Sequence, residues 1–209
     1  LVGKGYQIRI GAHRYDLSNK PKVRRLDRVS IVYNIKNAVT KVASPLGGGI
    51  YIEVPYKKSA GIVNVQIKNA VRSPYFSMKS FHQTSLSDWR NTEREHGAPW
   101  ADFQTEKYMM QVPTSWIYKY DDPSKALTKW DTAMDVVGDL MGYPHIRGKE
   151  SLFIQVDVII RAKAYSPGYP QVNITYDPYK NYNGNEAKSP IQGPPNAWYV
   201  TFHEMGHGQ

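Results

Sequence analysis

Residues 195–209 are the most informative stretch of the chain, and they read Pro195-Asn196-Ala197-Trp198-Tyr199-Val200-Thr201-Phe202-His203-Glu204-Met205-Gly206-His207-Gly208-Gln209. Within them His203, Glu204 and His207 form the pattern His-Glu-x-x-His. On a helix, four residues advance the azimuth by about 400°, so the two histidines lie one turn apart on one face and can bind the same ion. Asn196 is a suitable N-cap residue. We therefore predict a metal-binding helix that begins after Asn196.

The chemistry of this pattern suits zinc. Two neutral imidazoles and a third protein ligand leave the fourth tetrahedral position to water, as a catalytic zinc site requires. Glu204 follows the first histidine and is placed to take a proton from that water and to return it to a departing amine. Two alternatives remain: zinc bound only for structure, in a closed four-ligand site, and a pair of partly buried histidines near a helix end. The chain has no cysteine, so any metal must be held by histidine and carboxylate.

Length and composition indicate one or two folded domains. The chain has 209 residues, of which 41% are hydrophobic and 22% charged. No apolar run is long enough to span a membrane, so we predict no membrane span. The chain begins at Leu1, which is not a methionine, and stops at Gln209 within the predicted metal-binding helix. We expect it to be a fragment at both ends.

The positive charge is concentrated in the first third of the chain. Residues 1–72 hold 14 Lys/Arg and 3 Asp/Glu, a net +11, whereas residues 73–209 hold 13 and 15, a net −2. This asymmetry predicts two domains, 1–72 and 73–209, the first able to attract anionic partners such as anionic glycans. A solvated basic face with no partner is an equally good interpretation. No zinc-finger spacing, RNP-type aromatic motif or basic heptad is present, so we predict no nucleic-acid partner.

Short alternating segments predict that the first domain is a small antiparallel β-sandwich. The segments are residues 6–10, 29–35, 50–54 and 62–67, each rich in β-branched side chains and separated by turn residues. Helix and loop signals dominate the second domain. Loops carrying Trp89, Trp100 and Trp116 precede a helix that begins at Asp122-Pro123 and ends at Gly142. Its apolar stripe comprises Leu127, Trp130, Met134, Val137 and Met141. A strand over residues 152–160 and a loop-rich stretch to Pro195 complete the prediction.

The chain also resembles a known family, the enhancin-like, mucin-degrading zinc metallopeptidases (peptidase family M-sixty), over nearly its whole length. Five segments in order carry the resemblance: Ser44-Pro45-Leu46-Gly47-Gly48-Gly49-Ile50-Tyr51-Ile52, Ala98-Pro99-Trp100-Ala101-Asp102-Phe103, Val112-Pro113-Thr114-Ser115 with Asp121-Asp122-Pro123, Gly168-Tyr169-Pro170, and Trp198 to Gln209. Gly208 stands where the family often has asparagine, a departure that leaves the ligands themselves intact.

The resemblance implies an α+β fold, in which the small N-terminal antiparallel β-sandwich precedes the N-terminal part of a zincin catalytic domain of the gluzincin type. It implies that His203 and His207 are zinc ligands, that Glu204 is the general base, and that the third ligand is a glutamate on a later helix beyond Gln209. The implied substrate is an O-glycosylated protein such as mucin, in a secreted or cell-surface setting. Aromatic rings can stack on sugar faces, and we assign Tyr169 and Trp198 to substrate binding on that ground.

The resemblance allows a second function as well. Relatives of this family, the TRP-channel-associated factors, regulate channels and show that the architecture can serve interaction in place of proteolysis. The alternative is therefore a non-catalytic glycan-binding or channel-associated scaffold, in which the basic first domain does the work. Replacing Glu204 by alanine distinguishes the two, because only the enzyme depends on that carboxylate.

Overall fold

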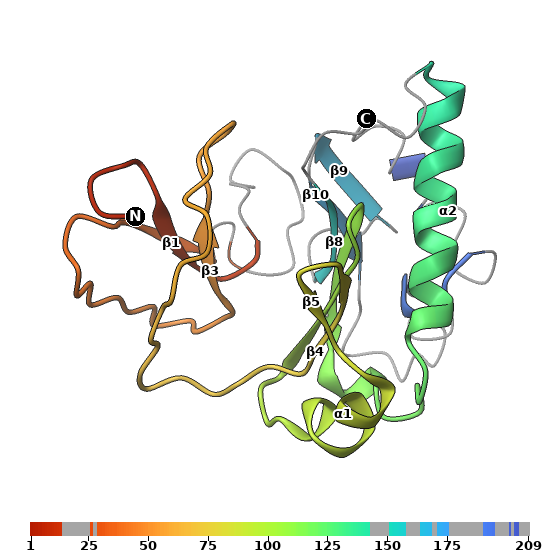
Figure 1. Cartoon of the computed structure of the whole chain (residues 1–209), viewed down its shortest axis with the longest axis horizontal. Helices are drawn as coiled ribbons and strands as arrows, with labels where there is room; N and C mark the ends of the chain where they lie inside the picture. The colour runs from red at the N-terminus through yellow and green to blue at the C-terminus, as the bar shows by residue number, and fades with distance from the viewer. Residues whose placement is uncertain are drawn as a thin grey trace. The chain divides into compact units, whose positions relative to one another are not determined.

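The computed structural model describes residues 1–13, 26, 29–142, 151–157, 164–168, 171–175, 190–194, 201, 203 and 204. The chain divides into two compact units, Leu1–Ala70 and Val71–Gln209 (Figure 1). The secondary structure is a mixture of sheets and a few helices, which confirms the α+β class. None of the described helices is long and apolar enough to cross a membrane.

The first unit contains a three-stranded antiparallel sheet in the order β2-β1-β3. Its strands are β1 (Gln7–Ile10), β2 (Ile31–Asn34) and β3 (Ile50–Glu53). One face is polar: the Arg9 guanidinium donates to both carboxylate oxygens of Glu53, from Nε at 2.6 Å and from Nη2 at 3.2 Å. The other face carries isoleucines in register, because Ile10 lies opposite Ile31 on one side and Ile50 on the other.

Three of the four strands predicted in this unit are present, and the fourth prediction is wrong. Residues 62–67 have the alternation of a strand, but they form no strand and are exposed throughout. The described residues of the unit therefore form a single sheet, where two would be needed for a sandwich. Alternation of apolar and polar residues indicates that a segment suits a half-buried strand, but the strand forms only when a neighbouring strand pairs with it.

The second unit is built on a seven-stranded mixed sheet in the order β5-β4-β6-β7-β8-β10-β9. Parallel pairing joins β4 to β6, β7 to β8 and β8 to β10, and the other neighbours are antiparallel. The strands are β4 (Tyr75–Lys79), β5 (His82–Gln83), β6 (Trp100–Gln104), β7 (Tyr108–Pro113), β8 (Leu152–Asp157), β9 (Ala164–Gly168) and β10 (Gln171–Thr175).

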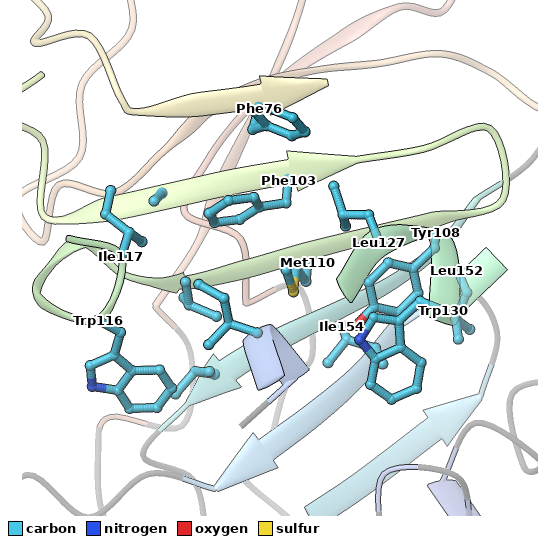
Figure 2. Packing of buried hydrophobic residues seen from close by; sticks show 14 of the residues in the cluster. Phe76, Phe103, Tyr108, Met110, Trp116, Ile117, Leu127, Trp130, Leu152 and Ile154 are labelled. Atoms are coloured by element: carbon cyan, nitrogen blue, oxygen red, sulfur yellow. The ribbon is translucent and has the colours of Figure 1, made fainter. Parts of the chain in front are cut away.

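The helix α2 (Ser124–Leu140) packs on one face of this sheet, and the predicted stripe is its buried side. Leu127, Trp130 and Met134 are buried as expected, whereas Gly138 completes the stripe and Met141 is exposed. Figure 2 shows Trp130 beside Tyr108 of β7, and the two rings stack with centroids 5.0 Å apart and planes 8° apart. The same core includes Phe76, Phe103, Met110 and Ile154 from four neighbouring strands.

A second, shorter helix packs on the part of this core that Phe76 and Phe103 form. In α1 (Leu86–Asn91), the Ser85 hydroxyl accepts from the backbone N–H of Asp88 at 2.9 Å, as an N-cap does. Trp89 is fully buried and meets the edges of Phe76 and Phe103, at centroid distances of 5.6 and 5.3 Å. Its indole N–H donates to the carbonyl of Tyr120 at 2.8 Å.

Two predictions for the second unit need correction. The stretch from residue 73 to the helix, expected as loops, contains β4 to β7 and α1, so Trp89 lies on a helix and Trp100 begins a strand. The stretch before Pro195, also expected as loops, contains β9 and β10. Residues 152–157 of the strand predicted over 152–160 form β8, and residues 158–160 lie outside the described residues. Both faces of β8 are buried, as is typical of a strand with parallel neighbours on both sides.

Candidate metal centre

The described part of the His-Glu-x-x-His pattern is helical. Thr201, His203 and Glu204 all have helical backbone conformation. Thr201 is fully buried, His203 is exposed and Glu204 is half-buried. Residues two apart on a helix point about 200° apart, so this segment has a buried side at Thr201 and an accessible side at His203. An exposed imidazole is a ligand that fits zinc, and the carboxylate next to it in the sequence fits the role of a base.

The other predicted site residues, His207, Tyr169 and Trp198, lie outside the described residues. Across the part of the chain that is described, no three His, Asp or Glu side chains come together in a way that could hold a metal. Of the His-Glu-x-x-His pattern, the described residues include only His203 and Glu204. The roles predicted for these side chains therefore remain predictions.

Residues 190–193, which precede this segment in the chain, contact α2 and the loop before it, and no sequence motif predicts these contacts. In the short 3-10 helix η3 (Pro190–Gln192), the Pro190 carbonyl accepts from the Trp130 indole N–H at 2.7 Å. The Gln192 amide donates to the Tyr120 hydroxyl. Gly193 follows with φ +66°, and a Cβ there would lie 3.1 Å from Cα of Ala126. A glycine is needed here both for the backbone conformation and for the close approach to the helix.

A row of polar side chains crosses the sheet on the face opposite the hydrophobic core. In register, Asp102 of β6 lies opposite Gln111 of β7, and Gln111 lies opposite Gln155 of β8. The Gln111 amide donates to Asp102 Oδ1 at 3.1 Å, and both glutamines are almost completely buried. No sequence motif marks this row. The available signal was a polar residue in the interior of each of three strands, and the three residues can be related only once the strands are aligned.

Tyr75 extends the polar row into β4. It lies opposite Asp102 in register, and its hydroxyl donates to Gln104 Oε1 at 2.6 Å. Burial raises the pKa of the Tyr75 phenol above its ordinary value, and the negative charge of Asp102 adds to this, while a hydrogen bond with Ser77 opposes it. The row therefore combines a carboxylate, two amides and a neutral phenol on one sheet face.

Comparison with known proteins places the chain in a family. Residues 69–209 match the model of the family described as peptidase M60, enhancin and enhancin-like, and residues 1–68 match that of the N-terminal domain of M60-like peptidases. Both matched models describe domains of metallopeptidase type. The chain belongs to the peptidase M60, enhancin and enhancin-like family, which confirms the resemblance found in the sequence.

Similar individual proteins include channel-associated factors. The chain is 31% identical to human TRPM8 channel-associated factor 2, over 98% of this chain and 21% of that protein. It is 28% identical to the TRPM8 channel-associated factor homolog of Danio rerio, over 100% of this chain and 22% of that protein. The chain thus spans about a fifth of the length of the curated relatives it matches.

A crystal structure of a functionally unknown conserved protein from Bacillus anthracis shares the fold. Its TM-score is 0.60 at 16% sequence identity, over 91% of this chain and 36% of that one. At this level of identity the likeness concerns the fold alone.

Proposed function

We propose that this chain is part of a zinc-dependent endopeptidase that cleaves O-glycosylated, mucin-like proteins. The observation that carries the proposal is the intact pattern His203-Glu204-x-x-His207 in a member of the M60 family. The helical conformation at His203 and Glu204 and the exposure of His203 support it.

Each residue has a distinct role in the proposed mechanism. His203 and His207 would hold zinc as neutral imidazoles, with a third ligand, a glutamate, expected beyond Gln209. When bound, zinc supplies a Lewis acid and brings the pKa of water down to about 7. Glu204 accepts the proton of the attacking water and delivers it to the nitrogen of the leaving amine. Tyr169 and Trp198 would contribute aromatic faces for sugars next to the cleaved bond.

The proposal extends to partners and location. The net +11 of residues 1–72 would favour anionic glycans on the substrate. An O-glycosylated substrate places the protein outside the cell, secreted or at the cell surface. No nucleic acid is proposed as a partner, since nothing in the sequence beyond charge points to one.

The experiment uses the full-length protein and compares wild type with Glu204→Gln, which keeps the size of the side chain and removes the base. Bound zinc is measured per molecule, and cleavage is measured on an O-glycosylated mucin and on the same mucin stripped of its glycans. We expect equal zinc in both proteins and cleavage of the glycosylated mucin by wild type alone. His203→Ala should lose zinc as well as activity. Cleavage by Glu204→Gln at the wild-type rate would disprove the role of the carboxylate.

A second candidate function is favoured by the relatives. Proteins named TRPM8 channel-associated factors match nearly the whole chain at 28–31% identity, so a channel-associated scaffold is the alternative. In that case Glu204→Gln leaves the protein's binding to its membrane-protein partner unchanged, and neither form cleaves mucin. Zinc held in a closed four-ligand site, with no exchangeable water, would indicate a structural metal.

A further inference from the structure

One long segment of the first unit lies entirely in solvent. Every residue from 56 to 70 is exposed, a stretch we call the exposed segment. The exposed segment contains several large apolar side chains: Tyr56 is 73% exposed, Ile62 is completely exposed, and Val65 and Ile67 are each about half exposed. Large apolar side chains exposed along one short stretch of chain are typical of a segment that contacts a partner.

The charge of the exposed segment has one sign. Lys57, Lys58 and Lys68 lie in it, and it contains no aspartate or glutamate. Among the described residues of the first unit, Glu53 is the only acid, and its carboxylate is held by Arg9. The described part of this unit therefore offers apolar side chains and lysines together, with no unpaired acid to repel an anionic surface.

A tight turn presents the first part of the segment. The Lys58 N–H donates to the carbonyl of Pro55 at 2.9 Å, and Lys57, the third residue of the turn, has φ 57°. Glycine or asparagine is favoured at such a position, and a lysine there is uncommon. Figure 1 shows the chain leaving β3, rising beyond the strand and returning. The fold thus accepts an unfavourable conformation and projects a lysine and an aromatic ring at the turn.

We propose that the exposed segment is a site of attachment to an anionic membrane surface, with the lysines at the lipid headgroups and Tyr56 and Ile62 inserted at the boundary of the acyl chains. Lysines beside exposed apolar and aromatic side chains are the combination that peripheral attachment uses. A soluble polyanion, such as an acidic glycan, would satisfy the lysines but leave the apolar side chains in water. The proposal rests neither on the proposed peptidase activity nor on the extracellular location proposed with it.

A direct test uses the full-length protein with any cysteine outside residues 1–209 replaced by serine, so that one introduced thiol is unique; residues 1–209 themselves contain no cysteine. A Ser59→Cys variant of the chain carries an environment-sensitive dye in the exposed segment, and Lys129→Cys carries it on α2 as the matched control. Both are mixed with phosphatidylcholine vesicles containing about 30% phosphatidylserine, and with vesicles of phosphatidylcholine alone. We expect a blue shift only for the Ser59 probe and only with the anionic vesicles. Equal shifts with both kinds of vesicle, or none, would overturn the proposal.

Charge and insertion are then separated by sedimentation with the anionic vesicles. Lys57→Glu/Lys58→Glu should weaken binding by more than about 25-fold, since each lysine near such a surface contributes about fivefold. Tyr56→Ser/Ile62→Ser should weaken it as well. Control variants with the same changes on α2, Lys125→Glu/Lys129→Glu and Val136→Ser/Leu140→Ser, should bind like wild type.

Two further results would overturn the proposal. If the lysine pair weakens binding and Tyr56→Ser/Ile62→Ser does not, the segment binds a polyanion, which heparin competition would then show. If the vesicles bind none of the proteins and the chain forms a dimer that Ile62→Ser dissociates, a second copy covers the segment.

The variant Lys57→Gly controls for misfolding, because glycine relieves the positive φ at this position. It should unfold no more easily than wild type and still bind vesicles about fivefold more weakly.

Discussion

The contact between Trp130 and Pro190 gives a measurable link between the main helix and the chain that leads to the metal-binding pattern. Trp130 is fully buried, stacks on Tyr108 and donates to the Pro190 carbonyl at 2.7 Å. Trp130→Phe keeps an aromatic ring for the stack but removes the N–H donor and part of the ring volume. The Pro190 oxygen keeps a second donor, the N–H of Gly193 at 3.0 Å.

The expected loss in the free energy of unfolding follows from these two changes. The lost hydrogen bond costs about 1 kcal/mol, because the acceptor is not left without a donor. The gap beside the smaller ring costs about another 1 kcal/mol. We therefore expect a loss of about 2 kcal/mol, which lowers the melting temperature by about 6 °C for a unit of this size.

Tryptophan fluorescence during urea unfolding measures this change in the second unit alone. All five tryptophans lie in residues 71–209, and the first unit has none. The control is Tyr108→Phe, which keeps the stack and removes a buried hydroxyl that has no hydrogen-bond partner among the described residues. It should be as stable as wild type or more so. A loss below about 0.5 kcal/mol for Trp130→Phe, or an equal loss for the control, would refute the reasoning.

Three other substitutions test separate features of the second unit. Gly193→Ala places a Cβ 3.1 Å from Ala126 Cα at φ +66° and should cost about 1–2 kcal/mol of unfolding free energy, and a silent substitution would mean that η3 does not approach α2 so closely. Ser85→Ala removes the N-cap acceptor of Asp88 N–H and should cost about 1 kcal/mol, whereas Ser85→Thr keeps a hydroxyl that can accept from Asp88 N–H and donate to Asp88 Oδ2, as Ser85 does, and should lose less. Burial raises the pKa of the Asp131 carboxyl, although Thr105 and Lys107 oppose the shift. Because the folded state then holds its proton more tightly than the unfolded chain, the Asp131 contribution to stability is present below the ordinary carboxyl pKa and declines as pH rises through the raised value. Asp131→Asn should therefore flatten the pH dependence of urea unfolding in that window and be at least as stable as wild type at neutral pH, and an unchanged slope would exclude Asp131 as its source.

The sequence predicted correctly the helix in which several local signals agree. The helix expected between Asp122-Pro123 and Gly142 is present as Ser124–Leu140, because a capping residue, a proline and an apolar stripe all agree there. By contrast, Tyr108–Pro113 lacks clear alternation, since four of its six residues are buried and they lie on both faces of the sheet. Residues 62–67 show the opposite failure, because a clear alternation found no strand to pair with.

The residues of the candidate site also differ in how far the sequence alone predicts them. The pattern at residues 203–207 is local, so the sequence alone brings out His203 and Glu204 and predicts their helix. The row formed by Asp102, Gln111 and Gln155 is invisible in the sequence, because its members come from three strands and meet only through the register of the sheet. The need for glycine at residue 193 is hidden for the same reason, since its neighbour Ala126 lies on a helix 67 positions earlier.

The parallel pairing of β7 with β8 also governs what happens while the chain is being made. Strands β6 and β7 are joined by a short turn and can pair as soon as both have left the ribosome. The partner for the outer side of β7 begins only at Leu152, 39 positions after β7 ends at Pro113. At roughly 5–20 residues per second, that side stays open for several seconds of synthesis. A nascent chain stalled in this interval would present an apolar strand edge, so translation speed across α2 should influence how much of the protein reaches the folded state and how much aggregates.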